Sequence, residues 1–113
     1  MKNNTKKYLY IFGYQTPQQV ALAATDQHSE ESSEALFIEA ESPEQALAWG
    51  REISDTFVRR LFHDQPIDWK SMNYVHWVEC EQMEFPATIL DQLQVVAFGH
   101  FPNFQCWIEA VAK

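Results

Sequence analysis

The sequence contains no long apolar run, and its uninterrupted apolar stretches are only a few residues long. A membrane-spanning helix needs roughly 20 consecutive apolar residues, so none is expected. The basic segment Met1–Lys7 precedes an aromatic, strand-like segment that lacks the apolar core and the cleavage site of a secretory signal. We therefore expect a cytoplasmic protein that does not bind membranes.

Glycine and cysteine are scarce, and their positions exclude several kinds of site. The 3 glycines are isolated from one another, so the chain has no glycine-rich loop to hold a phosphate group. The 2 cysteines, Cys80 and Cys106, have no metal-binding spacing to each other or to a histidine. We expect no cofactor and interpret both cysteines as buried thiols, because disulfides are rare in the cytoplasm. Whether the two lie close together stays open.

Positive charge is absent from two long stretches of the chain. The sequence has 8 lysines and arginines against 16 acidic residues, which gives a net charge of −8. No lysine or arginine occurs from Tyr8 to Gly50 or from Ser71 to Ala112. Such a surface repels nucleic acid and anionic membranes and attracts a basic protein partner. The simpler interpretation is that the acidic surface only keeps the protein soluble.

The composition that remains predicts a folded domain with a hydrophobic core. The 113 residues are 46% apolar and 14% aromatic. The clearest segment is a strand over 35–41 followed by a helix over about 43–63, with Ser42 at the N-cap, Pro43 at the first helical position and Gln45 completing a capping box. One face of this helix is marked by apolar residues and a glycine spaced three or four apart: Leu47, Gly50, Ile53, Phe57 and Leu61.

The complete pattern predicts a single α+β domain over residues 1–113. Its sheet is antiparallel or mixed, has four to five strands, and carries the one main helix on one face. Further strands are predicted at 8–14, 73–80, 94–100 and 104–110, and short helices at 18–24 and 87–93. We expect a disordered basic tail at 1–6 and a mobile acidic loop at 25–34.

The first strand has apolar residues on both of its faces, so alternation alone does not say which face meets the helix. We expect Leu9 and Ile11 to face the helix. Tyr8, Tyr10 and Tyr14 would then lie on the other face, where phenol groups tolerate water. Such a face is either a binding or dimerisation surface or is covered by the long loops.

The chain carries no catalytic signature, so an enzyme is not favoured. The first hypothesis is a small acidic interaction module, of the inhibitor, immunity or adaptor type, that binds a basic partner surface. Its expected contact residues are Asp26, Glu30, Glu31, Glu34, Tyr10, Tyr14 and Trp69. Trp69 is the tryptophan we expect to be partly exposed, although a role in closing the core is slightly favoured over an interface role.

Two alternatives stay open. The second hypothesis is a small-molecule-binding domain or enzyme with a pocket between the sheet and the helix. That pocket would be lined by Tyr74, His76, Trp77 and His100. The third hypothesis is a homodimer formed through the aromatic face of the sheet.

Overall fold

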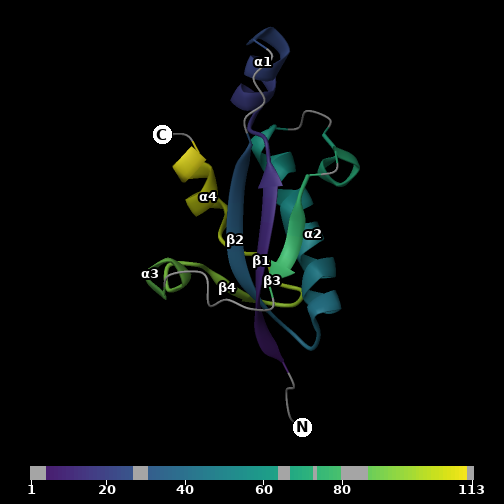
Figure 1. Ribbon diagram of the computed structural model, residues 1–113, viewed down its shortest axis with the longest axis vertical. Coiled ribbons are helices and arrows are strands. Elements are labelled where there is room, and N and C mark those ends of the chain that lie inside the picture. The colour runs from purple at the N-terminus through teal and green to yellow at the C-terminus, as the bar shows by residue number, and fades with distance from the viewer. Residues whose placement is uncertain (1–4, 27–30, 64–66, 73, 80–86, 112–113) are drawn as a thin grey trace.

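The computed structural model describes residues 5–26, 31–63, 67–72, 74–79 and 87–111 (Figure 1). Its elements are, in order, β1 (Lys6–Tyr14), α1 (Pro17–Asp26), β2 (Ser32–Ala40), α2 (Pro43–Leu61), the 3-10 helix η1 (Trp69–Met72), β3 (His76–Glu79), α3 (Ala87–Leu90), β4 (Val95–Ala97) and α4 (Phe104–Val111). The four strands form one mixed sheet in the order β3-β1-β2-β4. β1 is antiparallel to β2 and β3, whereas β4 is parallel to β2. The predicted α+β fold with one principal helix is confirmed.

Helix α2 begins where the sequence predicts. Ser42 is extended, and its hydroxyl accepts a hydrogen bond of 3.1 Å from the Gln45 amide. The Gln45 side chain accepts in return from the Glu41 amide at 3.0 Å, one residue earlier than a standard capping box. Four residues of the predicted stripe are buried, namely Gly50, Ile53, Phe57 and Leu61, whereas Leu47 is half-buried and Ala46 is buried in its place. Because fully burying a large apolar side chain contributes about 1.5–3 kcal/mol, this stripe fixes α2 on the sheet.

The predicted orientation of β1 is wrong. Tyr10 and Tyr14, together with Phe12 between them, lie on the face that α2 covers, and each is at most 1% exposed. Leu9 and Ile11 lie on the opposite face. The reason is chemical, because the buried Tyr10 hydroxyl needs a partner and finds one on α2. Its oxygen lies 2.7 Å from Ser54 Oγ.

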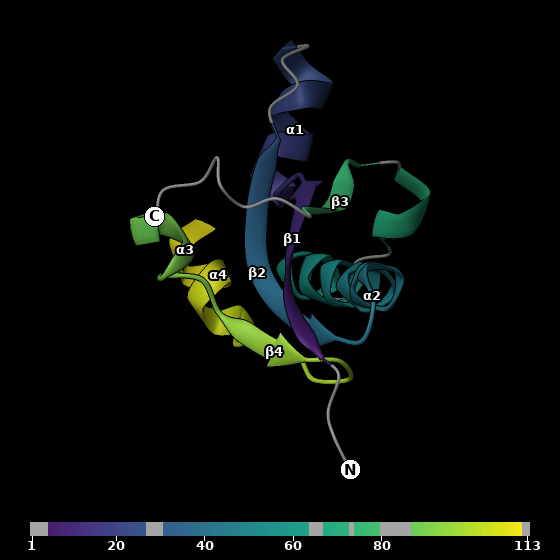
Figure 2. The same cartoon turned by 60° about the horizontal axis from the view of Figure 1, so that its bottom comes forward.

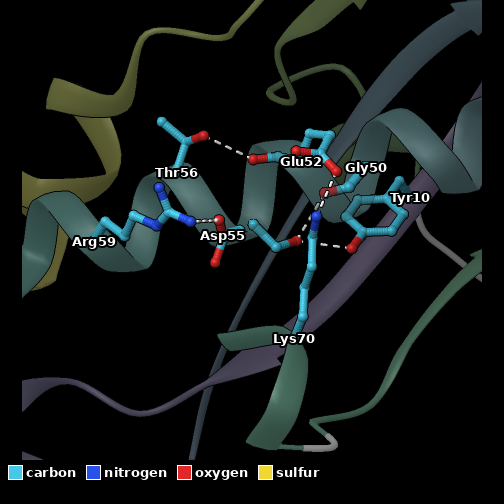
Figure 3. A network of polar contacts seen from close by, with 8 residues as sticks. Tyr10, Gly50, Glu52, Asp55, Thr56, Arg59 and Lys70 are labelled. Atoms are coloured by element: carbon cyan, nitrogen blue, oxygen red, sulfur yellow. Dashed lines mark hydrogen bonds and ion pairs between the residues drawn. The ribbon is translucent and has the colours of Figure 1, made fainter. Parts of the chain in front are cut away.

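This contact belongs to a short polar chain between the sheet and α2 (Figure 3). Ser54 Oγ donates to the Gly50 carbonyl oxygen at 2.9 Å, so the Tyr10 hydroxyl must donate to Ser54 Oγ. The side chain of Tyr10 passes directly over Gly50, where no Cβ is in the way. Both hydroxyls are buried and satisfied, as a core requires.

A second polar contact on α2 is an ion pair within one helical turn (Figure 3). The distance between Asp55 Oδ2 and Arg59 Nη2 is 2.7 Å. The carboxylate is 5% exposed and does not lie on a solvated face. Its other oxygen, Oδ1, has no hydrogen-bond partner among the described residues.

The fifth predicted strand, over 104–110, is wrong, because this segment forms helix α4. Phe104 and Trp107 are three residues apart and are both buried against Phe57 of α2. The Asn103 side chain caps the helix by accepting from the Gln105 amide at 3.0 Å. The predicted strand over 94–100 is correspondingly reduced to β4, which ends before a turn with Gly99 at φ +90°.

Several predicted boundaries also change. β1 already includes Lys6, which was assigned to the tail, and β2 begins at Ser32, inside the expected loop over 25–34. α1 extends to Asp26, so residues 25 and 26 are helical and not part of a loop. The strand predicted over 73–80 is β3, and its register places His76 and Val78 on the face of Phe12 and Tyr10. Residues 73 and 80, which the prediction included in that strand, lie outside the described residues.

Candidate functional site

A cleft lies beside β2 where the sheet is incomplete. β4 pairs with only three residues of β2, Phe37 to Glu39, so the preceding residues Ser33–Ala35 form an edge of the sheet. Helices α3 and α4 lie on this side of β2 (Figure 2). We call the space that they enclose with the strand the β2 edge cleft.

The β2 edge cleft consists of two cavities that share four lining residues: Glu34, Ala35, Ile89 and Leu93. The outer cavity, of about 310 Å³, is formed between the sheet face of Leu9 and Ile11 and helix α3. The inner cavity, of about 520 Å³, extends to α4 and is lined there by Cys106, Trp107 and Ala110. Most of the described lining residues are apolar, and Glu34 is the one acidic residue among them.

The position of α4 in the cleft is set by Gln94, the residue before β4. Its side chain makes two hydrogen bonds with the main chain of Asn103, donating to the carbonyl oxygen at 3.0 Å and accepting from the amide at 2.7 Å. Asn103 is the residue that caps α4. Gln94 therefore ties the start of α4 to the start of β4 beside the inner cavity, which it also lines.

Glu34 is held in the cleft by Tyr14, whose hydroxyl donates to Glu34 Oε2 at 3.2 Å. Burial raises the pKa of the Glu34 carboxyl above its usual value, and the tyrosine hydrogen bond opposes this shift only in part. The pKa of Tyr14 is also raised, first by burial and then by the neighbouring Glu34 charge. Glu34 forms no ion pair with any described residue.

The charge of the cleft follows from how the chain folds. Its lining residues come from two parts of the sequence, one within Tyr8–Gly50 and one within Ser71–Ala112. These are the two stretches that contain no lysine or arginine. The fold therefore brings both cation-free stretches together at one edge of β2. Asp91 and Glu109 are exposed and are each adjacent in sequence to a lining residue.

Among the predicted contact residues that the structure describes, only Glu34 lines the cleft. Glu31 is exposed just before β2. Tyr10 and Tyr14 are buried in the core and offer no surface to a partner. The main chain of Asp26 ends α1, and Glu30 lies outside the described residues.

Trp69 closes the core, which was the favoured of its two predicted roles. It is 1% exposed, so the expected partial exposure is wrong. Its indole nitrogen donates to the Gly13 carbonyl oxygen at 2.8 Å. The ring also packs edge-on against Phe12.

The four residues of the predicted pocket are not brought together. Tyr74 and His76 are near each other, with His76 Nδ1 2.9 Å from the Tyr74 carbonyl oxygen. Trp77 lies on the opposite face of β3 and is 41% exposed. His100 follows β4 at the other edge of the sheet. The two cavities of the β2 edge cleft are lined by none of the four.

Sequence reasoning missed most of the cleft. Cys106 was expected to be a buried strand residue, but it is a free, exposed cysteine on α4. Cys80 lies outside the described residues. The two cation-free stretches were visible in the sequence, yet their meeting depends on the parallel pairing of β4 with β2.

The described part of the chain offers no other obvious chemistry. It contains no group of three or more histidine, cysteine, aspartate or glutamate residues arranged to bind a metal ion. None of its helices combines the length and apolarity that crossing a membrane requires. Comparison with family models, curated proteins and solved structures gives no significant match to this chain.

Proposed function

We propose that this protein is a non-enzymatic interaction module that binds a basic segment of a partner protein in the β2 edge cleft. The observation that carries the proposal is the half-buried Glu34 carboxylate, which has no cationic partner among the described residues. A lysine or arginine side chain of a partner would supply that cation. Hydrogen bonds between charged groups are roughly twice as strong as those between neutral groups.

The walls of the cleft support a protein partner. Protein interfaces combine an apolar centre, often with an aromatic anchor, and a polar rim. Here Ile89 is 51% exposed at one wall and Trp107 lines the other. Asp91 and Glu109 add negative charge beside the cleft, where it would attract a basic partner and speed the encounter.

A small apolar amine is the second candidate ligand. The inner cavity of about 520 Å³, which Glu34 lines together with residues of α4, is within the size range of small-molecule sites. A screen for thermal stabilisation by apolar amines tests this candidate, because a ligand that binds only the folded protein raises the melting temperature. A homodimer through the aromatic face of the sheet is not proposed, because Tyr10, Phe12 and Tyr14 on that face are buried in the core beneath α2.

Selection from a library of short random peptides tests the main proposal. We expect enriched peptides to carry lysine or arginine between apolar residues. Isothermal titration calorimetry should then show weaker binding as the salt concentration rises, because salt screens the attraction between exposed charges. Enrichment of acidic or neutral peptides would contradict the proposal.

Two variants with the same change in net charge make the test specific. Glu34→Gln removes the charge in the cleft and keeps an oxygen that accepts from the Tyr14 hydroxyl. Glu44→Gln removes the charge of an exposed residue in the first turn of α2, outside the cleft lining. We expect Glu34→Gln to weaken peptide binding about tenfold, as the loss of about 1.4 kcal/mol implies, and Glu44→Gln to have little effect. Equal effects of both variants would contradict a role for the cleft.

A further inference from the structure

We infer that the partner segment binds as an added β-strand along the edge of β2, beside Ser33 and Ala35. This inference rests on the proposed function and specifies how the partner is held. It also predicts the sequence pattern of the bound segment.

Hydrogen bonds already present in the sheet fix the direction of the main-chain groups of β2. The Phe37 amide donates to the Gln94 carbonyl oxygen, and the Phe98 amide donates to the Glu39 carbonyl oxygen, both at 2.9 Å. The odd-numbered residues of β2 therefore direct their N–H and C=O groups away from β1, because main-chain direction alternates along a strand. Ser33 and Ala35 belong to the same set, so their N–H and C=O groups point into the cleft.

The hydrogen bonds of β1 on the side away from β2 lead to the same direction for the main-chain groups of Ser33 and Ala35. The Gly13 amide donates to the Val75 carbonyl oxygen at 2.8 Å, so the odd-numbered residues of β1 point away from β2. Gly13 is opposite Ser33, and Ile11 is opposite Ala35. Because the main-chain groups of these two β1 residues point away from β2, neither pair exchanges hydrogen bonds across the two strands. No described residue makes a hydrogen bond with the outward groups of Ser33 and Ala35.

An edge with unpaired main-chain groups is a template for another strand. Proteins that bind peptides in this way obtain affinity from main-chain hydrogen bonds and specificity from pockets for alternate side chains. The segment Ser33–Ala35 provides room for about three residues, or roughly 10 Å of extended chain. Beyond it, β4 already occupies the edge of β2.

The side chains of β2 determine which residues such a strand would carry. Ser33 and Ala35 face the outer cavity with Ile11, whereas Glu34 faces the other side of the sheet with Tyr14. Residues directly opposite each other on neighbouring strands share a face. The bound segment would therefore have apolar residues opposite Ser33 and Ala35, and a lysine or arginine opposite Glu34. The predicted pattern is apolar-basic-apolar.

A synthetic peptide with this pattern is the probe. We choose Ser-Thr-Val-Lys-Val-Thr-Ser, acetylated and amidated at its ends, and measure its affinity by calorimetry. In ¹⁵N NMR spectra of the protein, we expect the Ala35 amide to shift and to become protected from hydrogen exchange when the peptide is added, because it would gain a hydrogen bond. Peptide binding that leaves the Ala35 amide unchanged would overturn the inference.

Ala35→Pro removes the outward amide, and Ala35→Val is its matched control. Proline is tolerated at strand edges where its nitrogen faces outward, and valine restores the amide with a side chain of similar size. We expect Ala35→Pro to bind the peptide about tenfold more weakly than Ala35→Val. A peptide with all three central amides N-methylated tests the same hydrogen bonds on the wild-type protein, so the result does not depend on the folding of a variant. We expect this peptide to lose at least tenfold in affinity.

The outcomes separate this inference from the proposed function. If Glu34→Gln weakens binding but Ala35→Pro and N-methylation do not, strand addition is wrong and the basic-partner proposal stands. If the probe does not bind at all, strand addition with this pattern is wrong, and the library selection decides the proposed function independently. If binding depends on both Glu34 and the Ala35 amide, both proposals are supported.

Discussion

Gly50 of α2 lies so close to Tyr10 of β1 that a Cβ atom on the glycine would be 2.5 Å from Cδ1 and Cε1 of the ring. This contact allows the helix to approach the sheet closely. It also explains why a glycine occupies the middle of a long helix, where it costs roughly 1 kcal/mol relative to alanine. The ring of Tyr10 has no exposed surface, so it has little room to move away.

We therefore expect Gly50→Ala to destabilise the protein, although alanine is the better helix former. Forcing an extra methyl group into a packed core typically costs about 1–3 kcal/mol, which exceeds the gain in helix propensity. Urea unfolding measures the difference. In a Tyr10→Leu background the same substitution should cost less, and a Gly50→Ala variant as stable as wild type would contradict the packing described here.

The direction of the hydrogen bonds between Tyr10 and Ser54 predicts an order of stability for two variants. Tyr10→Phe removes the donor but leaves Ser54 bonded to the Gly50 carbonyl, so we expect a loss of about 1 kcal/mol. Ser54→Ala leaves the buried Tyr10 hydroxyl without its partner, which costs about 1–3 kcal/mol. The same unfolding measurement ranks the two, and a larger loss for Tyr10→Phe would contradict this assignment.

Glu34 gives the protein a predictable dependence on pH. Because burial raises its pKa in the folded state, the folded protein binds more protons than the unfolded chain, and stability falls as the pH rises. The stability that protonated Glu34 contributes to the folded protein is complete below the unfolded-state pKa. It is lost as the pH rises through the higher folded-state pKa. We expect Glu34→Gln to be more stable than wild type near neutral pH and to lose this advantage below the usual glutamate pKa of 4.5.

Urea unfolding of wild type and Glu34→Gln across this pH range checks the prediction. Glu44→Gln is the control for a general effect of net charge, since Glu44 is exposed. A Glu34→Gln variant that is less stable than wild type at neutral pH would contradict the prediction. It would show that contacts in the cleft stabilise the Glu34 charge by more than burial destabilises it.

Gln94→Ala should loosen the attachment of α4 without unfolding the sheet. The substitution removes both hydrogen bonds to Asn103, at 2.7 and 3.0 Å, and leaves β4 in place. Hydrogen exchange of the α4 amides should become faster, while exchange in β1 stays close to that of wild type. Gln92→Ala, at an exposed lining residue, is the matched control. Unchanged exchange in α4 would contradict the anchoring role of Gln94.

The sequence predicted the elements whose signals lie within one segment. It failed for features that depend on contacts between distant parts of the chain. Helix α2 was predictable because Ser42, Pro43 and the apolar spacing all indicate the same element. The apolar composition of the segment 104–110 predicts a strand, but the spacing of Phe104 and Trp107 and the Asn103 cap indicate the helix that forms. β1 carries apolar residues on both faces, so its orientation depended on a partner for the Tyr10 hydroxyl.

The candidate site was less predictable than the fold. The absence of positive charge from two stretches was readable, and Glu34 was among the predicted contact residues. The cleft itself requires a short β4 paired in parallel with β2, which no local pattern specifies. Residues that line it from α3 and α4, such as Ile89 and Trp107, had no signal that separated them from ordinary core positions.

The most direct test of the central claim is to map where a selected basic peptide binds, using changes in the ¹⁵N NMR spectrum of the wild-type protein. We predict that the largest shifts fall on the amides of Ser33–Ala35 and on residues of α3 and α4 that line the β2 edge cleft. Shifts confined to the exposed outer residues of α2, or to β3 at the opposite edge of the sheet, would contradict the account.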